Sequence, residues 1–439
     1  MMKLKVTSKL LLGLAAIAPF AGYATNGDNM IAIGPKSRAM GGLSIAYPQD
    51  AITAVFGNPA SLCFTKFCPS TQADLGLTLF MPDVSAEVTN PLNPSETLKA
   101  SSNDKIYPIP SIGWAKPFGE DNRGRFGLAA YGVSGLGVNY RQANIGGMLT
   151  DLAPIEMIPP AFQQAPIIAG SYTSLQIMKF SPSVAWQVAP NVSVGGALHI
   201  DYAILDMGTG ESDGFGWGVQ LGMVYRPTED TSIGLVYVSP QEVTHDGVVN
   251  LGMGPQDLAL EAPQQIGAGI AYEMDEGRLM IGADIRWINW ADATGYKDFD
   301  WANQTVIALG LQYEAIEDKL VLRAGYNYGK NPVREHNGWD GSFDIASGMP
   351  NDMKNVQGII MPTYFYETFR IIGFPAIVES HVTFGMTYHV SEKFALSLAF
   401  MAALEKDIVE TGTGPTGAPT TLKSTLSETS IELGFAWKY

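Results

Sequence analysis

A few ionisable residues lie inside segments that otherwise alternate apolar and small side chains, and they are the first candidates for chemistry. Three of them are cations: Lys179, Arg286 and Arg323. A guanidinium can bind a carboxylate through two parallel hydrogen bonds, so these cations are candidate partners for the carboxylate of a ligand. The alternative is that they form ion pairs with acidic residues on the same face. The remaining ionisable residues of this kind are His199, Asp201, Asp284 and Glu432.

The segments that carry these residues alternate with a period of two, which predicts β-strands. In one of them, the apolar Ile285 and Trp287 alternate with the charged Asp284 and Arg286. Aromatic residues near the strand ends and a small, Gly-rich opposite face favour a membrane barrel over a soluble sandwich. Segments 191–202, 280–290, 320–329 and 431–439 all follow this pattern.

Turn residues join these strands in pairs, and longer segments separate the pairs. Short turns on one side and long loops on the other are typical of outer-membrane barrels, which close with an even number of strands. We therefore predict an all-β fold, a transmembrane antiparallel β-barrel of about 14 strands. The predicted strands lie near 71–82, 106–118, 123–138, 173–189, 191–207, 214–226, 230–245, 260–273, 278–291, 303–314, 319–331, 378–390, 393–408 and 426–439.

The composition agrees with a membrane barrel. Only 16% of the 439 residues are charged, whereas about 25% is usual for soluble domains. A hydrophobic fraction of 46% with 48 glycines argues against disorder, which needs high charge and few apolar groups. The net charge of −16 argues against nucleic acid as a partner. After the N-terminal region, no stretch is long and apolar enough to predict a spanning helix.

The N-terminal residues predict export. Lys3, Lys5 and Lys9 precede an apolar run from Leu10 to Phe20, and small residues precede a cleavage site after Ala24. We therefore expect a signal peptide at 1–24 and localisation in the outer membrane of a Gram-negative bacterium. The mature chain then divides into an N-terminal hatch at 25–70 and a barrel at 71–439 with long extracellular loops.

The predicted hatch is rich in Gly and Pro and has no strand pattern. A barrel of about 14 strands is too wide for its own side chains to fill, so a segment of this size is expected to plug the lumen. Cys63 and Cys68 are the only cysteines, and in an oxidising compartment they favour a local disulfide. No metal site is expected, because a closed zinc site needs four ligands and no His lies nearby.

Several motifs in this order resemble the outer-membrane long-chain fatty acid and hydrocarbon transporters, the FadL/TodX-type family. The N-terminal motifs are Gly34-Pro35-Lys36-Ser37-Arg38-Ala39-Met40-Gly41-Gly42, Tyr47-Pro48-Gln49-Asp50-Ala51 and Asn58-Pro59-Ala60. Strand motifs follow at 110–114, 127–137, 181–186, 284–290 and 322–326. The resemblance covers essentially the whole mature chain.

The resemblance implies a 14-stranded barrel with a hatch that rearranges to let hydrophobic molecules pass. The matching hatch or gate residues are Gly41, Gly42, Asn58, Pro59 and Ala60. The family has a kink in the third strand that opens sideways toward the membrane, and the matching residues here are Gly132, Gly135 and Gly137. Glycines at this density also permit a bulge on physical grounds, although they equally ease crowding inside a barrel.

The segment 354–378 is unusually apolar for an outer loop. An exposed apolar patch often marks a binding surface, so this segment is a candidate capture groove. The alternative is that the loops pack on one another as a lid. The capture candidates are Ile359, Tyr364, Phe365, Phe369 and Phe374.

We therefore expect a monomeric transporter of hydrophobic small molecules that works by diffusion, without a cofactor. Long-chain fatty acids are the first expectation, uptake of aromatic or aliphatic hydrocarbons is the alternative, and a structural or adhesive barrel is a second alternative. No nucleophile motif or nucleotide loop points to an enzyme. The other expected partners are outer-membrane lipid and lipopolysaccharide.

Overall fold

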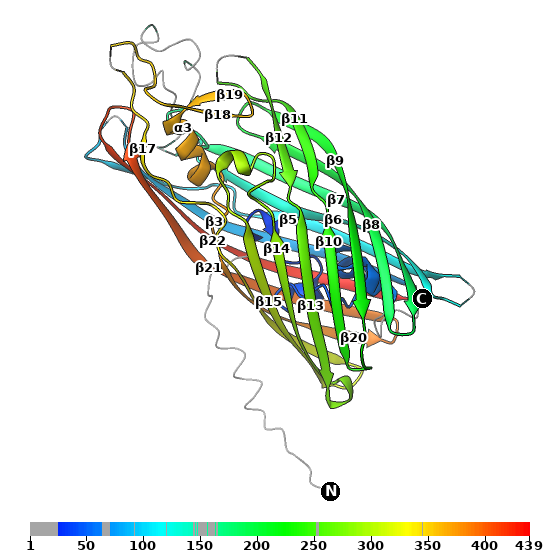
Figure 1. The fold of residues 1–439 in the computed structure, drawn as a ribbon. Coiled ribbons are helices and arrows are strands. Elements are labelled where there is room, and N and C mark those ends of the chain that lie inside the picture. Colours follow the sequence, from blue (N-terminus) through cyan, green and yellow to red (C-terminus); the bar gives the residue numbers. More distant parts are fainter. Residues whose placement is uncertain are drawn as a thin grey trace, which may run out of the picture.

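The computed structural model describes residues 25–439 except 64–70, 92, 120, 252–253, 345 and most of 144–165, of which it describes 145, 147, 156 and 163. In the described residues, fourteen antiparallel strands form a closed barrel (Figure 1). The ring closes because β22 pairs with β3, with Leu422 opposite Val88 and Lys438 opposite Gln72. The barrel strands are β3 (Gln72–Thr89), β5 (Tyr107–Phe118), β6 (Gly124–Asn139), β7 (Tyr172–Ala189), β8 (Val192–Asp206), β9 (Glu211–Tyr225), β10 (Thr231–Val238), β13 (Gln265–Met274), β14 (Leu279–Ile288), β15 (Gln304–Ile316), β16 (Leu320–Gly329), β20 (Ser380–Ser391), β21 (Phe394–Thr413) and β22 (Pro419–Lys438).

The two faces of the barrel wall differ as the alternation predicts. Outward side chains are apolar and open, as at Ile285 and Leu433, which are each 50% exposed. Their inward neighbours Asp284 and Glu432 are buried. An apolar outer band of this kind is suited to lipid rather than to water.

No helix in the described part of the chain is long and apolar enough to cross a membrane.

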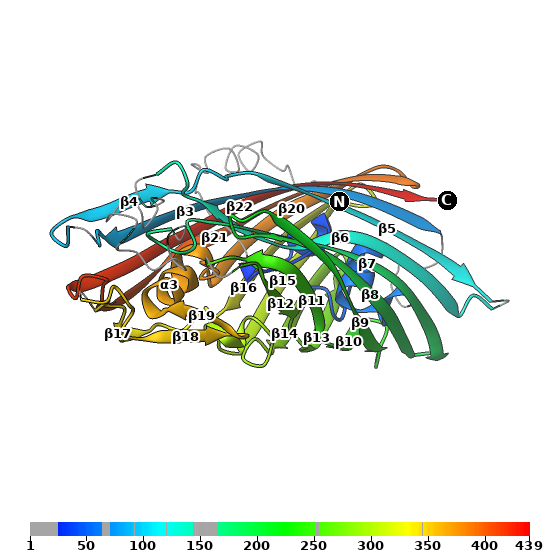
Figure 2. The same ribbon diagram turned by 90° about the horizontal axis from the view of Figure 1, so that it is seen from above.

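The two ends of the barrel also differ, as the turn pattern predicts. Short turns join β5 to β6, β7 to β8 and β9 to β10 at one end, which we call the turn end. The other end, the loop end, carries the longer segments, and both views show α3 and β17–β19 gathered there (Figures 1 and 2). The elements of the loop end are β4 (Thr97–Ser101), β11 (Gln241–Val249), β12 (Gln256–Ala262), the 3-10 turn η6 (Lys297–Phe299), β17 (Asn337–Asp340), β18 (Met353–Val356), β19 (Ile359–Pro362), α3 (Thr363–Thr368) and a π-helical turn η7 (Phe369–Gly373).

One predicted strand is too long: of the segment 230–245, only β10 lies in the wall. It breaks after Val238, and β11 leaves the barrel to pair with β12. Pro240 has no backbone N–H and cannot donate to a ladder, which accounts for the break. β11 instead lies against the inner face of β9, where a side chain at Gly214 would come within 2.6 Å of the Thr244 carbonyl oxygen.

Residues 25–63, which we call the hatch, lie inside the barrel as the dark blue segment of Figure 1. They form β1 (Thr25–Asn26), β2 (Asn29–Met30), α1 (Pro35–Arg38), α2 (Ala51–Gly57) and the 3-10 helix η1 (Pro59–Cys63). Asp50 caps α2 by accepting a hydrogen bond from Thr53 N at 2.8 Å. The predicted signal peptide at 1–24 and the Cys63–Cys68 disulfide lie outside the described residues.

Buried polar contacts fix the hatch to the wall. Arg38 Nε lies 2.6 Å from Glu432 Oε2 on β22, and both side chains are fully buried. Further along the same side of the wall, on β20 and β16, Gly41 N donates to Thr383 Oγ1 at 2.8 Å, and Asn327 Nδ2 donates to the Gly41 carbonyl at 2.9 Å. The hatch is therefore held from several strands at once.

Candidate functional site

A groove of about 390 Å³ opens among the loops at the loop end. Three of the capture candidates line it: Ile359, Phe365 and Phe369. The other two, Tyr364 and Phe374, are buried behind this wall and do not line the groove. The segment 354–378 thus forms a folded unit, and its apolar side chains make one wall of a groove in place of an open patch.

A cation lies at the edge of this groove. The Arg141 guanidinium stacks over the Tyr172 ring at 3.7 Å from the ring centroid, and its Nε donates to Asn139 Oδ1 at 3.2 Å. Both Arg141 and Tyr172 line the groove. A mostly apolar groove with a cation at its edge suits an amphipathic ligand, since the guanidinium can bind an acidic head group.

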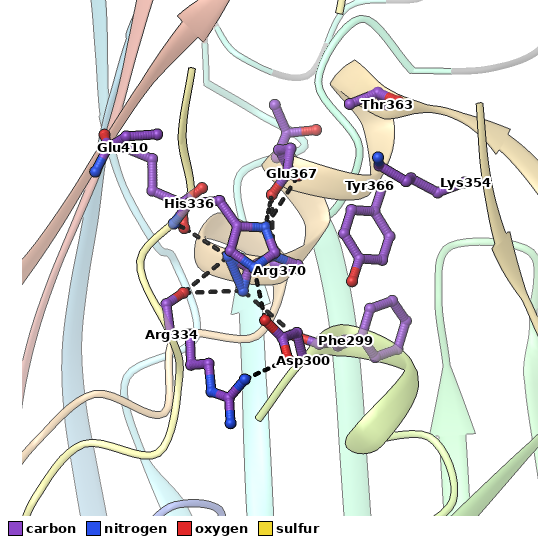
Figure 3. Close-up of polar contacts among 12 residues, drawn as sticks. Phe299, Asp300, Arg334, His336, Lys354, Thr363, Tyr366, Glu367, Arg370 and Glu410 are labelled. Atoms are coloured by element: carbon purple, nitrogen blue, oxygen red, sulfur yellow. Dashed lines mark hydrogen bonds and ion pairs between the residues drawn. The ribbon is translucent and has the colours of Figure 1, made fainter. Parts of the chain in front are cut away.

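A cluster of charges holds the groove wall in place (Figure 3). Arg370 of η7 is fully buried, and its Nη2 lies 2.6 Å from Glu410 Oε1 on β21. The same guanidinium contacts Glu367 of α3 at 3.0 Å. It also donates to the backbone carbonyls of Arg334 and Phe299, at 2.8 and 3.3 Å. We call this cluster, with His336 and Asp300, the clasp.

His336 completes the clasp by joining two loops. Its Nδ1 lies 2.9 Å from Glu367 Oε2 and its Nε2 lies 3.0 Å from Asp300 Oδ2. The hydrogen bond with Glu367 raises the pKa of His336 above its ordinary value, because the carboxylate stabilises the protonated ring. The clasp therefore ties α3, which carries Phe365, to the loop that carries Phe299.

A chain of aromatic rings connects the groove to the lumen. Phe299 and Phe369 line the groove with ring centroids 5.0 Å apart, and Phe369 lies 6.1 Å from Phe374. Phe374 lies 6.3 Å from Tyr296, which lines a cavity inside the barrel. Trp290 and Trp301 pack on Tyr296 at 4.6 and 4.8 Å. We call these rings the aromatic path.

The lumen cavity lies between the hatch and the wall and has a volume of about 70 Å³. An apolar cavity of about 150 Å³ holds one benzene molecule, so the lumen cavity is too small even for a single-ring ligand. The structure therefore represents a closed state, and the hatch or the wall must move before a ligand occupies the lumen. On the hatch side, Met30 and Phe56 line the cavity.

Two of the three predicted carboxylate partners lie at the lumen cavity. Lys179 is 3.4 Å from Asp201 and also donates to Gln241 Oε1. Arg286 donates to two neutral acceptors, Gln265 Oε1 at 3.1 Å and Ser44 Oγ at 3.2 Å. Lys179 thus lies within 3.4 Å of an acidic partner, whereas the hydrogen bonds of Arg286 go to neutral acceptors and Asp284 is the carboxylate that lines the cavity with it.

The third candidate, Arg323, does not line either cavity. It lies toward the turn end of β16, where it donates to Gln312 Oε1, Thr387 Oγ1 and Gln49 Oε1 at 2.7–2.8 Å. Since Gln49 belongs to the hatch, Arg323 acts as a support for the hatch in this structure.

The predicted kink coincides with an interruption in the wall. Among the described residues, the ladder between β5 and β6 stops at Ser111 opposite Tyr131, although both strands continue. Pro108 and Pro110 of β5 have no backbone N–H to donate across this gap. The ladder of β6 with β7 also shifts register between Gly132 and Ser134.

The three predicted kink glycines have different surroundings. Among the described residues, a side chain at Gly135 would meet no atom within 4 Å, so this position faces open space. A Cβ at Gly137 would lie 2.8 Å from the Thr173 carbonyl oxygen, and one at Gly132 would lie 2.5 Å from Ile109 Cγ2. Gly132 and Gly137 therefore permit close packing, and Gly135 borders the gap itself.

The predicted gate residues are bound tightly to the wall. Asn58 Nδ2 donates to Ile45 O in the hatch at 2.9 Å and to Met223 O of β9 at 3.1 Å. Ser193 Oγ of β8 donates to the Ala60 carbonyl at 2.7 Å. Pro59 packs beside Gly195, and Gly42 lies close to Ile31 O. These contacts fix this part of the hatch to the barrel wall.

The hairpin at the start of the hatch sits at the gap. Asn29 of β2 bridges to Ser134 of β6, next to the register shift. Asp28 in the same hairpin accepts a hydrogen bond from the Tyr296 hydroxyl, at the end of the aromatic path. The hairpin therefore contacts the path from the groove and the gap in the wall.

A Ser–His contact in the lumen was not expected from the sequence. Ser181 Oγ lies 2.7 Å from His199 Nδ1. The carboxylate on the same face, Asp201, lies beside Lys179 instead of orienting the imidazole. A Ser-His-Asp relay needs the acid on the second ring nitrogen, so this geometry does not make a catalytic triad.

These features define a class: an outer-membrane barrel with an internal hatch and an apolar route through it. Residues 205–338 match the family described as "Outer membrane protein transport protein (OMPP1/FadL/TodX)". The resemblance to FadL/TodX-type proteins that the motifs indicate is thereby confirmed, and so is a location in the Gram-negative outer membrane. No curated protein sequence gives a match.

Several solved barrels have the same fold. The Pseudomonas putida toluene transporter TodX has a TM-score of 0.64 and 18% identity, with 94% of this chain and 100% of that chain covered. The Ralstonia pickettii toluene transporter TbuX has a TM-score of 0.60 and 16% identity, covering 93% and 98%. A Pseudomonas aeruginosa FadL homologue has a TM-score of 0.58 and 15% identity, covering 96% and 99%.

Proposed function

We propose that this chain carries hydrophobic small molecules across the outer membrane by diffusion. The observation that carries the proposal is the continuity of the apolar route. The aromatic path joins the outer groove to the lumen cavity, and the hatch hairpin next to that cavity borders the gap between β5 and β6. Burial of apolar surface, at about 25 cal/mol per Å², stabilises the ligand in the outer groove and in the lumen cavity.

The route has three steps. A ligand first binds in the outer groove, whose volume of about 390 Å³ is in the range of small-molecule sites. It then moves along the aromatic path while the lumen cavity enlarges from about 70 Å³ by displacement of the hatch hairpin. It finally leaves sideways through the gap beside Gly135, into the membrane.

Long-chain fatty acids are our first choice of substrate. Two cations support it, Arg141 at the outer groove and Arg286 at the lumen cavity, because each is placed where a carboxylate would end up when the alkyl chain fills an apolar space. Lys179 and Arg323 contribute less to such a ligand, since the first lies beside Asp201 and the second supports the hatch.

Aromatic hydrocarbons are the second choice. The rings of the aromatic path favour it, since aromatic pairs attract one another beyond simple burial of area. The similarity of the fold to two solved toluene transporters also supports aromatic hydrocarbons as substrates.

Two matched variants test the choice of substrate. Arg286→Met removes one of the cations that line the lumen cavity, and Arg323→Met removes a buried cation that does not line it. A fatty acid substrate predicts that Arg286→Met lowers uptake of a labelled fatty acid more than uptake of toluene. Equal effects on both compounds would reject the carboxylate role of Arg286 and leave hydrocarbons as the better candidate.

A further inference from the structure

One wall residue of the lumen cavity holds a buried acceptor that no described group uses. Asn327 of β16 lines the cavity and is 2% exposed. Its Nδ2 donates to the Gly41 carbonyl at 2.9 Å, and this bond fixes the orientation of the amide. Its Oδ1 has no hydrogen-bond partner among the described residues. The wall therefore offers a hydrogen-bond acceptor to whatever occupies the cavity.

The neighbours of Asn327 on the wall leave space beside this acceptor. Ala308 of β15 lies directly between Asn327 and Asp284 of β14 in the ladder, and all three residues line the cavity. Neighbouring strands are about 4.8 Å apart, so the single carbon of the Ala308 side chain lets a ligand atom approach the amide from this side.

The cation that we propose for a carboxylate lies on the same inner face. Arg286 is two residues from Asp284 along β14, and β14 is two strands from Asn327. Asp284 Oδ2 accepts hydrogen bonds from Ser44 N and Ile45 N of the hatch, at 2.8 and 3.0 Å. The hatch thus engages this carboxylate. An acid bound at Arg286 therefore has the Asn327 oxygen as an acceptor near its first carbon atoms.

The hatch contributes a second acceptor of the same kind. Asn26 lines the cavity and is 6% exposed, and its Oδ1 has no hydrogen-bond partner in the part of the chain that the structure describes. This oxygen would lie 3.0 Å from a Cβ at Gly329, which is two residues along β16 from Asn327. One cavity therefore combines a cation with two acceptors, and such a set suits a head group that both accepts and donates hydrogen bonds.

A carboxylate cannot pair with the Asn327 oxygen, because both groups are acceptors, whereas a hydroxyl group can donate to it. We propose that the lumen cavity selects carboxylic acids that carry a hydroxyl group near the carboxyl end. Arg286 binds the carboxylate, and the hydroxyl group donates to Asn327 Oδ1. This inference rests on the proposed function and names the class of its substrate.

The small volume of the closed cavity explains why a hydroxyl group matters. A volume of about 70 Å³ is sufficient for water, which needs roughly 10–15 Å³. A ligand that displaces water from a buried acceptor loses affinity unless it reproduces the hydrogen bond. Toluene and an unsubstituted fatty acid leave the Asn327 oxygen unpaired, and an unpaired buried acceptor is costly. A hydroxy acid restores the bond.

The test compares decanoic acid with 3-hydroxydecanoic acid on the purified barrel, by displacement of a fluorescent fatty acid. Asn327→Leu removes the acceptor together with the hydrogen bond to the Gly41 carbonyl. Thr383→Val is the matched control, because it removes the neighbouring hydrogen bond to Gly41 N from a residue that does not line the cavity.

We expect the preference for 3-hydroxydecanoic acid over decanoic acid to fall about tenfold in Asn327→Leu and to stay unchanged in Thr383→Val. A weaker hatch changes the affinity for both acids alike, so the ratio of the two affinities reports the contact with the hydroxyl group. Binding in the outer groove is common to all variants, since Asn327 does not line that groove. An unchanged ratio in Asn327→Leu would overturn the proposal and leave transport of unsubstituted acids standing. Binding of neither acid by the folded wild type would overturn the proposed function as well.

A second measurement uses the wild type alone, so it does not depend on the folding of any variant. 3-Oxodecanoic acid has a carbonyl group in place of the hydroxyl group and cannot donate to Asn327. We expect it to bind about tenfold more weakly than 3-hydroxydecanoic acid. Equal affinities for the two acids would show that the hydroxyl group is not recognised as a donor, and the proposal would be wrong.

Discussion

The hydroxyl of Tyr296 donates a hydrogen bond to the carboxylate of Asp28, although the two residues are 268 positions apart in the sequence. Tyr296 belongs to an outer loop and Asp28 to the hatch hairpin. The contact joins the end of the aromatic path to the element that covers the gap in the wall. A ligand that displaces the Tyr296 ring therefore also breaks a hydrogen bond that holds the hairpin.

Tyr296→Phe tests this relationship, because it keeps the ring and removes only the donor. A hydrogen bond to a charged group contributes roughly 1.5–3 kcal/mol, so we expect the closed hatch to lose about that much stability. Hydrogen exchange of the hairpin amides and uptake of a hydrophobic ligand should both become faster. Tyr326→Phe is the control, since Tyr326 bonds Ser380 on the outer face of the barrel. If hydrogen exchange of the hairpin amides is unchanged in Tyr296→Phe, the Tyr296 hydroxyl does not hold the hairpin in place.

Arg370→Met tests the clasp. The substitution removes the ion pairs of this buried guanidinium with the carboxylates of Glu367 and Glu410. Breaking a buried ion pair costs about 3–5 kcal/mol of folding stability. We expect a lower thermal midpoint and weaker binding of a fluorescent fatty acid at the cell surface, because α3 forms the groove wall. The control Arg334→Met removes an exposed cation of the same cluster and should change little. Similar losses in the two variants would argue against a special role of the buried pair.

Binding in the outer groove should also depend on pH through His336. The pKa of His336 in the folded protein is raised above 6.5 by Glu367. The protonated ring therefore stabilises the clasp fully below pH 6.5, and this contribution is lost as the pH rises through the higher value in the folded protein. We expect ligand affinity at the groove to fall by about two- to fivefold over that range, the size of a modest ion-pair effect. His336→Gln should remove this pH dependence, and a pH profile identical to that of the wild type would contradict the prediction.

Gly135→Val tests the lateral gap. The position meets no atom within 4 Å, so we expect a folded barrel with normal thermal stability. The branched side chain should narrow the opening and slow uptake, with Gly135→Ala intermediate. Gly137→Val, by contrast, places a Cβ 2.8 Å from a backbone carbonyl and should destabilise the barrel. Normal uptake by folded Gly135→Val would exclude this exit.

The sequence predicted the barrel well, because inward and outward side chains alternate along each strand. Fourteen predicted segments correspond to fourteen barrel strands, and the one error has a local cause. Residues 241–249 keep a period of two in β11, so alternation alone does not reveal that the chain leaves the wall after Val238. Pro240 was the only signal of the break.

The candidate site was predicted less completely. Alternation placed Lys179, Arg286 and Arg323 on the inner face, but it does not say how deep each lies or what it meets. Alternation thus predicts Arg323 as a ligand partner, and it gives no sign of the hydrogen bond that Arg323 donates to Gln49 of the hatch. The clasp and the Tyr296–Asp28 contact join segments far apart in sequence, such as Arg370 and Glu410, and no local pattern encodes such pairs.

The most direct test of the transport function is uptake by cells that lack their own transporter and express this chain. Labelled long-chain fatty acid and toluene are supplied in parallel, with Gly135→Val as the comparison. We expect the wild type to restore uptake of at least one compound and Gly135→Val to lower that uptake. Uptake of neither compound, with the barrel folded in the outer membrane, would contradict a transport function and favour a structural or adhesive role.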